Sequence, residues 1–252
     1  MHWADIIFTL DVSKSMDTRD MTDGSNQLSR LEIMRKFVID TITNHPENRY
    51  GIIIFAGTSL ISSPLTTDSE VLTDIVSSLD SKTIREGWTN IEDALKLSVD
   101  RFSDTKDPKT LVFMSDGWEP DDISSWDSIN TIIHSGKNIN FTIFWLWTDA
   151  GGQIPIGQDL FWNPIYKTQD GRDVVSKLGR ENLERLASIS NTNVTYINSS
   201  WDEGKFDSIL NASLKRNYLQ TTKEQDDSST RILLFISSLF LLASMLIIKS
   251  KK

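Results

Sequence analysis

The sequence predicts an α/β protein in which a doubly wound, mostly parallel sheet carries helices on both faces. Two observations lead to this fold class. Short apolar segments rich in β-branched and aromatic residues recur along the chain, as expected of strands that are buried on both sides. Between them lie segments with apolar residues at helical spacing, and strands that alternate with helices typically form an open parallel sheet. At 252 residues, the chain is long enough to bury one sizeable core.

The apolar segments account for five buried strands and one strand at an edge. The predicted core strands are DIIFTL at 5–10, YGIIIFA at 50–56, TLVFMS at 110–115, INFTIFWLW at 139–147 and NVTYI at 193–197. The segment TSLISSPL follows the second of these and contains Pro64, which suits an edge strand or one arm of a hairpin.

Helix starts are recognisable between the strands. Ser29 and Glu32 have the spacing of a capping box, as do Thr67 and Glu70, and Asn90 is a candidate cap for a third helix. Two further helices are predicted for GRENLERLASIS at 179–190 and GKFDSILNASLKRNYL at 204–219. We therefore assign residues 1–220 to a single α/β domain.

The C-terminal part of the chain has a different composition. The run from Ile232 to Ile248 is uncharged, apolar on all sides and long enough to span a bilayer, so 232–248 is predicted to be a transmembrane helix. Residues 221–231 form a polar linker before it, and residues 249–252 form a basic tail after it. We therefore expect a membrane protein with a single C-terminal anchor.

Composition excludes several functional classes. The formal net charge of −9 disfavours nucleic-acid binding, because an acidic surface repels phosphate backbones. The chain has no cysteine, so it can form neither a disulfide nor a thiolate metal site. Its three histidines are scattered along the sequence, which argues against a histidine-rich zinc site.

Oxygen-bearing side chains follow two of the predicted strands. Asp11, Ser13 and Ser15 come directly after the first strand, Asp116 follows the third core strand in chain order, and Thr89 precedes a predicted helix. In open α/β sheets, ligands bind beyond the carboxyl ends of the strands, where the strand order reverses. Two carboxylates and three hydroxyls, without nitrogen or sulfur, suit a hard divalent cation such as Mg²⁺, with Mn²⁺ or Ca²⁺ as alternatives.

These three motifs resemble the metal-ion-dependent adhesion site of von Willebrand factor A domains. The matching segments are DVSKS at 11–15, GWT at 87–89 and SDG at 115–117, in the order and at the separation of that family. The resemblance spans about residues 4–219. It implies that Ser13, Ser15 and Thr89 are hydroxyl ligands of Mg²⁺, that Asp11 and Asp116 bind the metal directly or through water, and that a partner's Asp or Glu completes the shell.

A narrower resemblance links the chain to bacterial Bat-type (aerotolerance) proteins. The segment after the fourth core strand is similar to a hairpin insertion of that group, followed by an L-x-x-E-x-L helix and the last strand. The resemblance implies partnership with other von Willebrand factor A proteins and with a MoxR-type AAA+ ATPase in envelope maintenance or complex assembly. Together with the C-terminal lysines, it favours an extracytoplasmic domain. The opening MHWAD offers no signal peptide, which would instead leave the domain in the cytoplasm.

Trp88, Trp118 and Glu119 lie beside the proposed ligands in sequence and are candidates for a partner-binding rim. Packing explains the two tryptophans equally well, and a solvated loop explains Glu119 better. Metal-dependent adhesion without catalysis is the function we expect. One alternative is a metal-dependent hydrolase or phosphotransferase with Asp11 as nucleophile, for which no acid/base residue is recognisable. The other is a purely structural membrane component.

Overall fold

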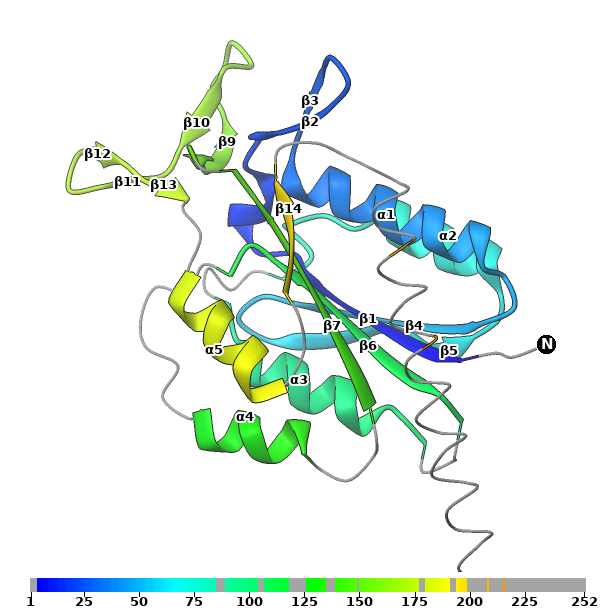
Figure 1. The fold of residues 1–252 in the computed structure, drawn as a ribbon. Helices are drawn as coiled ribbons and strands as arrows, with labels where there is room; N and C mark the ends of the chain where they lie inside the picture. Colours follow the sequence, from blue (N-terminus) through cyan, green and yellow to red (C-terminus); the bar gives the residue numbers. More distant parts are fainter. Residues whose placement is uncertain are drawn as a thin grey trace, which may run out of the picture.

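The computed structural model describes residues 4–84, 89–103, 107–117, 126–134, 139–148, 150–176, 180–190 and 194–198, together with Ser208 and Lys215. Its centre is a six-stranded sheet with the strand order β14-β7-β6-β1-β4-β5 (Figure 1). The strands of this sheet are β1 (Asp5–Asp11), β4 (Arg49–Phe55), β5 (Ser59–Thr66), β6 (Lys109–Ser115), β7 (Ile139–Trp147) and β14 (Val194–Asn198). All neighbouring strands pair in parallel except β4 and β5, which pair antiparallel.

Helices cover both faces of the sheet (Figure 1). One face carries α1 (Arg30–Asn44) and α2 (Ser69–Ser77), and the other carries α3 (Ile91–Asp100), α4 (Trp126–Ile133) and α5 (Arg180–Ser190). Each layer encloses its own apolar cluster, because successive strand residues point to opposite faces. In β1, Ile6 and Phe8 pack under α1, whereas Ile7 packs under α3.

The predicted fold class is confirmed for the domain, as a mixed sheet between two helical layers. The segment with Pro64 forms the antiparallel edge strand β5. Ser29 and Glu32 form the predicted capping box, and Asn90 caps α3 by accepting the backbone N–H of Asp93. The predicted cap at Thr67 is wrong by one residue. Asp68 caps α2 instead, because its carboxylate accepts the backbone N–H of Val71.

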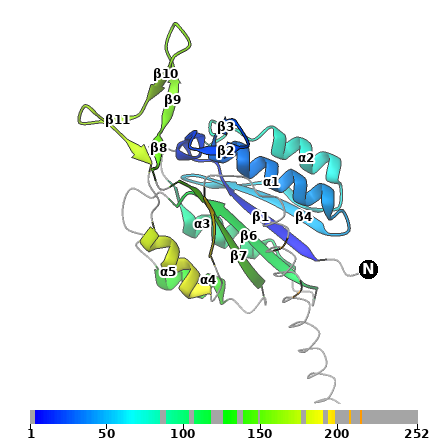
Figure 2. The ribbon, with the colours of Figure 1, turned by 45° about the horizontal axis from the view of Figure 1, so that its top comes forward.

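The segment between β7 and α5 forms the hairpin insertion that the Bat-type resemblance implies. Strands β9 (Pro155–Gln158) and β10 (Pro164–Tyr166) make a hairpin that projects from the body of the domain (Figure 2). A second hairpin is made by β11 (Thr168–Gln169) and β12 (Arg172–Asp173). At the base of the insertion, β8 (Gly152–Gln153) pairs with β13 (Val175–Ser176).

A further two-stranded ribbon, β2 (Met21–Asp23) with β3 (Asn26–Leu28), lies between the 3₁₀ helix η1 (Lys14–Asp17) and α1. Among the residues that the structure describes, no helix is long and apolar enough to cross a membrane. The predicted linker, transmembrane helix and basic tail at 221–252 lie outside those residues.

Candidate metal centre

Four segments meet at the carboxyl edge of the sheet. The strand order reverses between β1 and β6, since the chain runs from β1 towards β5 and then returns to β6 and continues in the other direction. Asp11 is the last residue of β1, and Asp116 follows directly after β6. Thr89 lies just before α3, in a segment that is tied to the end of β4 because Asn90 N donates to Ala56 O at 2.7 Å. The structure therefore brings the three predicted motifs together.

Four of the five predicted ligands form one chain of hydrogen bonds. Ser13 N donates to Asp11 Oδ1 at 2.8 Å, and the hydroxyls of Ser13 and Ser15 lie 3.0 Å apart. Ser15 Oγ donates to Asp116 Oδ1 at 3.1 Å. The fifth, Thr89, lines the same cavity as Ser13 and Ser15. All five side chains are buried, at 5% exposure or less.

The hydroxyl of Thr89 is unsatisfied. Its Oγ1 atom is buried and has no hydrogen-bond partner among the described residues. A buried hydroxyl without a partner is unfavourable, typically by about 1–3 kcal/mol. A cation held beside Ser13 and Ser15 would satisfy Thr89, so the residues present fit a divalent metal.

Asp11 is more deeply placed than its position after an apolar strand suggests. The sequence analysis placed Asp11 directly after the first strand, but Asp11 is still part of that strand, because it pairs with β4, and it is fully buried. Its second oxygen accepts a hydrogen bond of 2.5 Å from Ser115 Oγ. Burial, together with the Asp116 carboxylate nearby, raises the pKa of Asp11 to about 7. A bound cation would relieve this repulsion.

A buried arginine completes the site, and sequence reasoning missed it. Arg30 opens α1, and its Nη1 atom donates to Asp116 Oδ2 at 2.6 Å. It also binds Asp20 through two hydrogen bonds of 2.6 and 3.0 Å. Burial would lower the pKa of Arg30, but Asp116 and Asp20 raise it above its ordinary value. The position of Arg30 in the sequence could have indicated this role. A positive charge in the first turn lies at the positive end of the helix dipole, which is unfavourable, so Arg30 needs an acidic partner.

The same arginine fastens the insertion to the metal edge. Arg30 Nη1 donates to Ser176 Oγ at 2.7 Å, and Thr148 Oγ1 donates to Asp20 Oδ2 at 2.9 Å. Ser176 and Thr148 lie at the two ends of the insertion. Between them, Gly152 lies so close to the body that an added Cβ would stand 2.4 Å from Thr18 Cγ2. The insertion is therefore packed against the residues that support the site.

The other residues that the sequence singled out have different outcomes. Trp88, Trp118 and Glu119, the predicted partner rim, lie outside the described residues. Trp145 and Trp147 are buried in the core, as packing predicts. In the described part of the chain, no three His, Cys, Asp or Glu side chains lie together in a group that could hold a metal ion. A cation at this site would therefore need the hydroxyl ligands as well as the carboxylates.

Residues 6–119 match the family model of the von Willebrand factor type A domain, and this segment contains all five predicted ligands. No curated protein matches the chain as a sequence. The recognition of this domain from its three motifs is confirmed.

Solved structures extend the likeness over most of the chain. The conserved hypothetical protein BatB from Bacteroides thetaiotaomicron is 18% identical, with a TM-score of 0.70 over 87% of this chain and 99% of that one. An aerotolerance-related membrane protein from Bacteroides fragilis is 21% identical, with a TM-score of 0.70 over 84% and 99%. The predicted resemblance to Bat-type proteins is thus confirmed in the fold.

A more distant structure carries a metal. Proximal thread matrix protein 1 from the mussel byssus, with zinc in its MIDAS motif, is 16% identical. Its TM-score is 0.55 over 84% of this chain and 47% of that one.

Proposed function

We propose that this chain is a membrane-anchored von Willebrand factor A protein that binds Mg²⁺ at its adhesion site and grips an acidic side chain of a partner protein. The observation that carries this proposal is the buried hydroxyl of Thr89, which has no hydrogen-bond partner among the described residues and belongs to a residue that lines the same cavity as Ser13 and Ser15. Ser15 in turn is bonded to the buried carboxylate of Asp116. Ser13, Ser15 and Thr89 would hold the ion, and Asp11 and Asp116 would balance its charge. The ion would supply an electrophilic position for a carboxylate oxygen from the partner.

Interaction is favoured over catalysis by the state of Asp11. As a nucleophile it would have to reach a substrate, yet its carboxylate is fully buried, with both oxygens accepting hydrogen bonds from Ser13 and Ser115. A phosphatase assay with a generic aryl phosphate tests this alternative, and Mg²⁺-dependent turnover that disappears in Asp11→Ala would establish it. A purely structural role is disfavoured because every position of the ligand set holds an oxygen donor.

By resemblance to Bat-type proteins, we propose that the partners include other von Willebrand factor A proteins and a MoxR-type AAA+ ATPase, in envelope complex assembly or maintenance. The proposed anchor is the segment 232–248, with the domain on the extracytoplasmic side. Protease treatment of spheroplasts tests this orientation. Cleavage of the domain by external protease is the expected result, and protection until lysis would place the domain in the cytoplasm.

Titration calorimetry with Mg²⁺ tests the metal site itself. The wild-type protein should bind one Mg²⁺, and Asp11→Ala should bind none, since it removes a central negative charge. Asp17→Asn is the matched control: this carboxylate lies only six residues away, but it accepts a hydrogen bond from Ser81 instead of joining the site. Unchanged Mg²⁺ affinity in folded Asp11→Ala would reject the assignment.

A further inference from the structure

The β9–β10 hairpin ends in three large apolar side chains that are exposed to solvent. Leu160, Phe161 and Trp162 are 96%, 82% and 80% exposed, more than any other large apolar side chain in the described part of the chain. The hairpin projects from the body of the domain (Figure 2). Single apolar side chains are ordinary on a protein surface, but three in succession at a projecting tip indicate a contact surface.

The turn beneath these side chains is held in one conformation by Asp159. Its Oδ1 atom accepts the backbone N–H groups of Phe161 and Asn163, both at 2.8 Å. Its Oδ2 atom accepts from Asn163 Nδ2 at 3.0 Å. Trp162 has a φ of 66°, which is unfavourable for a residue with a Cβ. The turn therefore fixes the backbone with the apolar side chains outside, and this order lowers the entropy lost when the tip binds.

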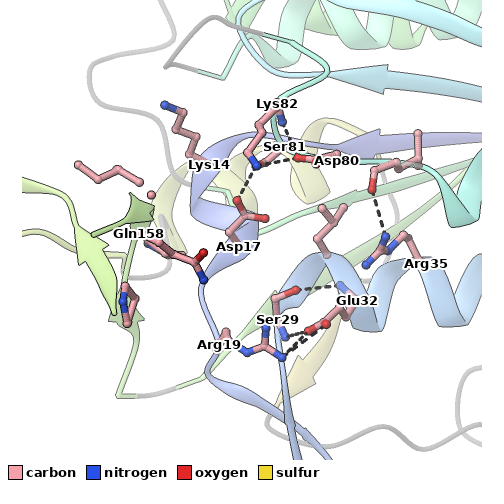
Figure 3. Close-up of a pocket in the computed structure, with 16 residues that line it drawn as sticks. Lys14, Asp17, Arg19, Ser29, Glu32, Arg35, Asp80, Ser81, Lys82 and Gln158 are labelled. Carbon is pink, nitrogen blue, oxygen red and sulfur yellow. Dashed lines mark hydrogen bonds and ion pairs between the residues drawn. The ribbon is translucent and has the colours of Figure 1, made fainter. Parts of the chain in front are cut away.

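The base of the hairpin, in contrast, belongs to the body of the domain. Residues 155–158 and Pro164 line a cavity of about 560 Å³. Figure 3 shows this cavity between the hairpin, represented by Gln158, and the loop that carries Ser81. Residues 159–163 do not line it. The hairpin is therefore supported at its base, while its apolar tip extends into solvent.

We propose that this tip inserts into the interface of the lipid bilayer in which the chain is anchored. The inference rests on the membrane anchor of the proposed function. A convex tip needs a matching apolar hollow in a protein partner, whereas a bilayer accepts it without one. Leu160 and Phe161 are uncharged and enter the acyl region without losing polar contacts, and the indole of Trp162 suits the headgroup level, where its N–H stays hydrated.

The length of the tether allows this contact. Residues 199–231 connect the end of β14 to the predicted anchor at 232–248. Of these 33 residues, 17 lie outside the predicted helix at 204–219 and can extend over about 55 Å, which exceeds the diameter of about 30 Å of a small domain. The edge with the hairpin can therefore face the bilayer. Because the domain is tethered, the tip meets the bilayer at an effective concentration of about millimolar order, so a weak contact suffices.

Insertion of the tip leaves the proposed metal site accessible. Ile156 lines the same cavity as Ser13 and Thr89, and it precedes Leu160 by four residues. At about 3.3 Å per residue, the hairpin places the tip up to about 13 Å from this cavity. Apolar groups in the membrane interface are buried to a depth of about 5–10 Å, so the metal cavity stays outside the bilayer. The contact would hold the metal edge close above the bilayer, within reach of a partner protein in the same membrane.

A fluorescent label at the tip tests this proposal. The chain has no cysteine, so Leu160→Cys in the full chain carries an NBD label at the tip alone. In phosphatidylcholine vesicles that contain a nitroxide-labelled lipid, the emission of this label should shift to shorter wavelengths and be quenched. Gln169→Cys is the control, because Gln169 is exposed on the neighbouring hairpin and has a polar side chain. Quenching at position 160 should be at least about twofold stronger than at position 169.

Further variants separate the tip from the anchor and from the metal site. Phe161→Ser combined with Trp162→Ser should reduce quenching at position 160 to the control level and leave the urea midpoint unchanged, because both side chains are exposed. Asp11→Ala should lose Mg²⁺ binding and keep the quenching. Equal quenching at positions 160 and 169, in a chain that floats with the vesicles, overturns the inference and leaves the tip to a protein partner. A chain that does not float with the vesicles rejects the proposed anchor and the inference with it.

Discussion

Replacing Arg30 with methionine should destabilise the domain more than any other single charge removal near the site. The guanidinium of Arg30 is fully buried and serves two carboxylates, Asp20 and Asp116, whose side chains are 6% and 0% exposed. Methionine keeps much of the apolar stem but leaves both carboxylates without their cation. Removing one partner of a buried ion pair typically costs about 3–5 kcal/mol, which is a large part of the total stability of a domain.

Urea denaturation monitored by tryptophan fluorescence measures this effect. With a slope of about 2 kcal/mol per M, a loss of 3–5 kcal/mol should lower the midpoint by about 1.5–2.5 M. Arg19→Gln is the matched control, because Arg19 also pairs with an acidic residue of this region, Glu32, but at 56% side-chain exposure. It should cost less than about 1 kcal/mol. If Arg30→Met cost no more than Arg19→Gln, the argument that Arg30 holds the site together would be refuted.

Three further predictions concern the site and the insertion. In the metal-free protein, the raised pKa of Asp11 means that its contribution to stability is present below about pH 4 and is lost as the pH rises through about 7. Mg²⁺ binds the ionised carboxylate, so the affinity for Mg²⁺ should fall by up to about tenfold for each pH unit below 7. Calorimetry at several pH values measures this affinity, and a constant value would contradict the prediction. Thr89→Val should raise the free energy of unfolding of the metal-free protein in urea, by up to about 1–3 kcal/mol, because it removes a buried hydroxyl that has no partner among the described residues. The same substitution should weaken metal-dependent binding of an acidic peptide in fluorescence titrations. Gly152→Ala should lower the free energy of unfolding by about 1–3 kcal/mol, because the added Cβ would meet Thr18. Gly157→Ala is the control, because a Cβ at Gly157 has open space around it. Equal melting temperatures of the two variants in thermal denaturation would contradict the packing argument.

Local patterns were sufficient for most of the fold. The apolar run before Asp11 and the alternating aromatic strand around Trp145 predicted buried strands, and Pro64 predicted an edge. The capping box at Ser29 marked the start of α1. These signals are short-range, because strand burial and helix capping are determined by residues within a few positions of each other. The cap of α2 was misplaced by one residue because Thr67 and Asp68 are both good capping residues and only their local geometry distinguishes them.

The five candidate metal ligands were also predicted from sequence alone, because each motif follows a recognisable strand or precedes a recognisable helix. Their burial and their mutual contacts were decided by the tertiary structure. Asp11 reaches Ser115 across 104 positions of sequence, and Arg30 reaches Ser176 across 146. Neither the periodicity of the sequence nor a short motif predicts hydrogen bonds between residues so far apart in the chain. The arginine that supports Asp116 is part of the site only because parallel strands align their carboxyl ends at one edge, where residues distant in sequence become neighbours.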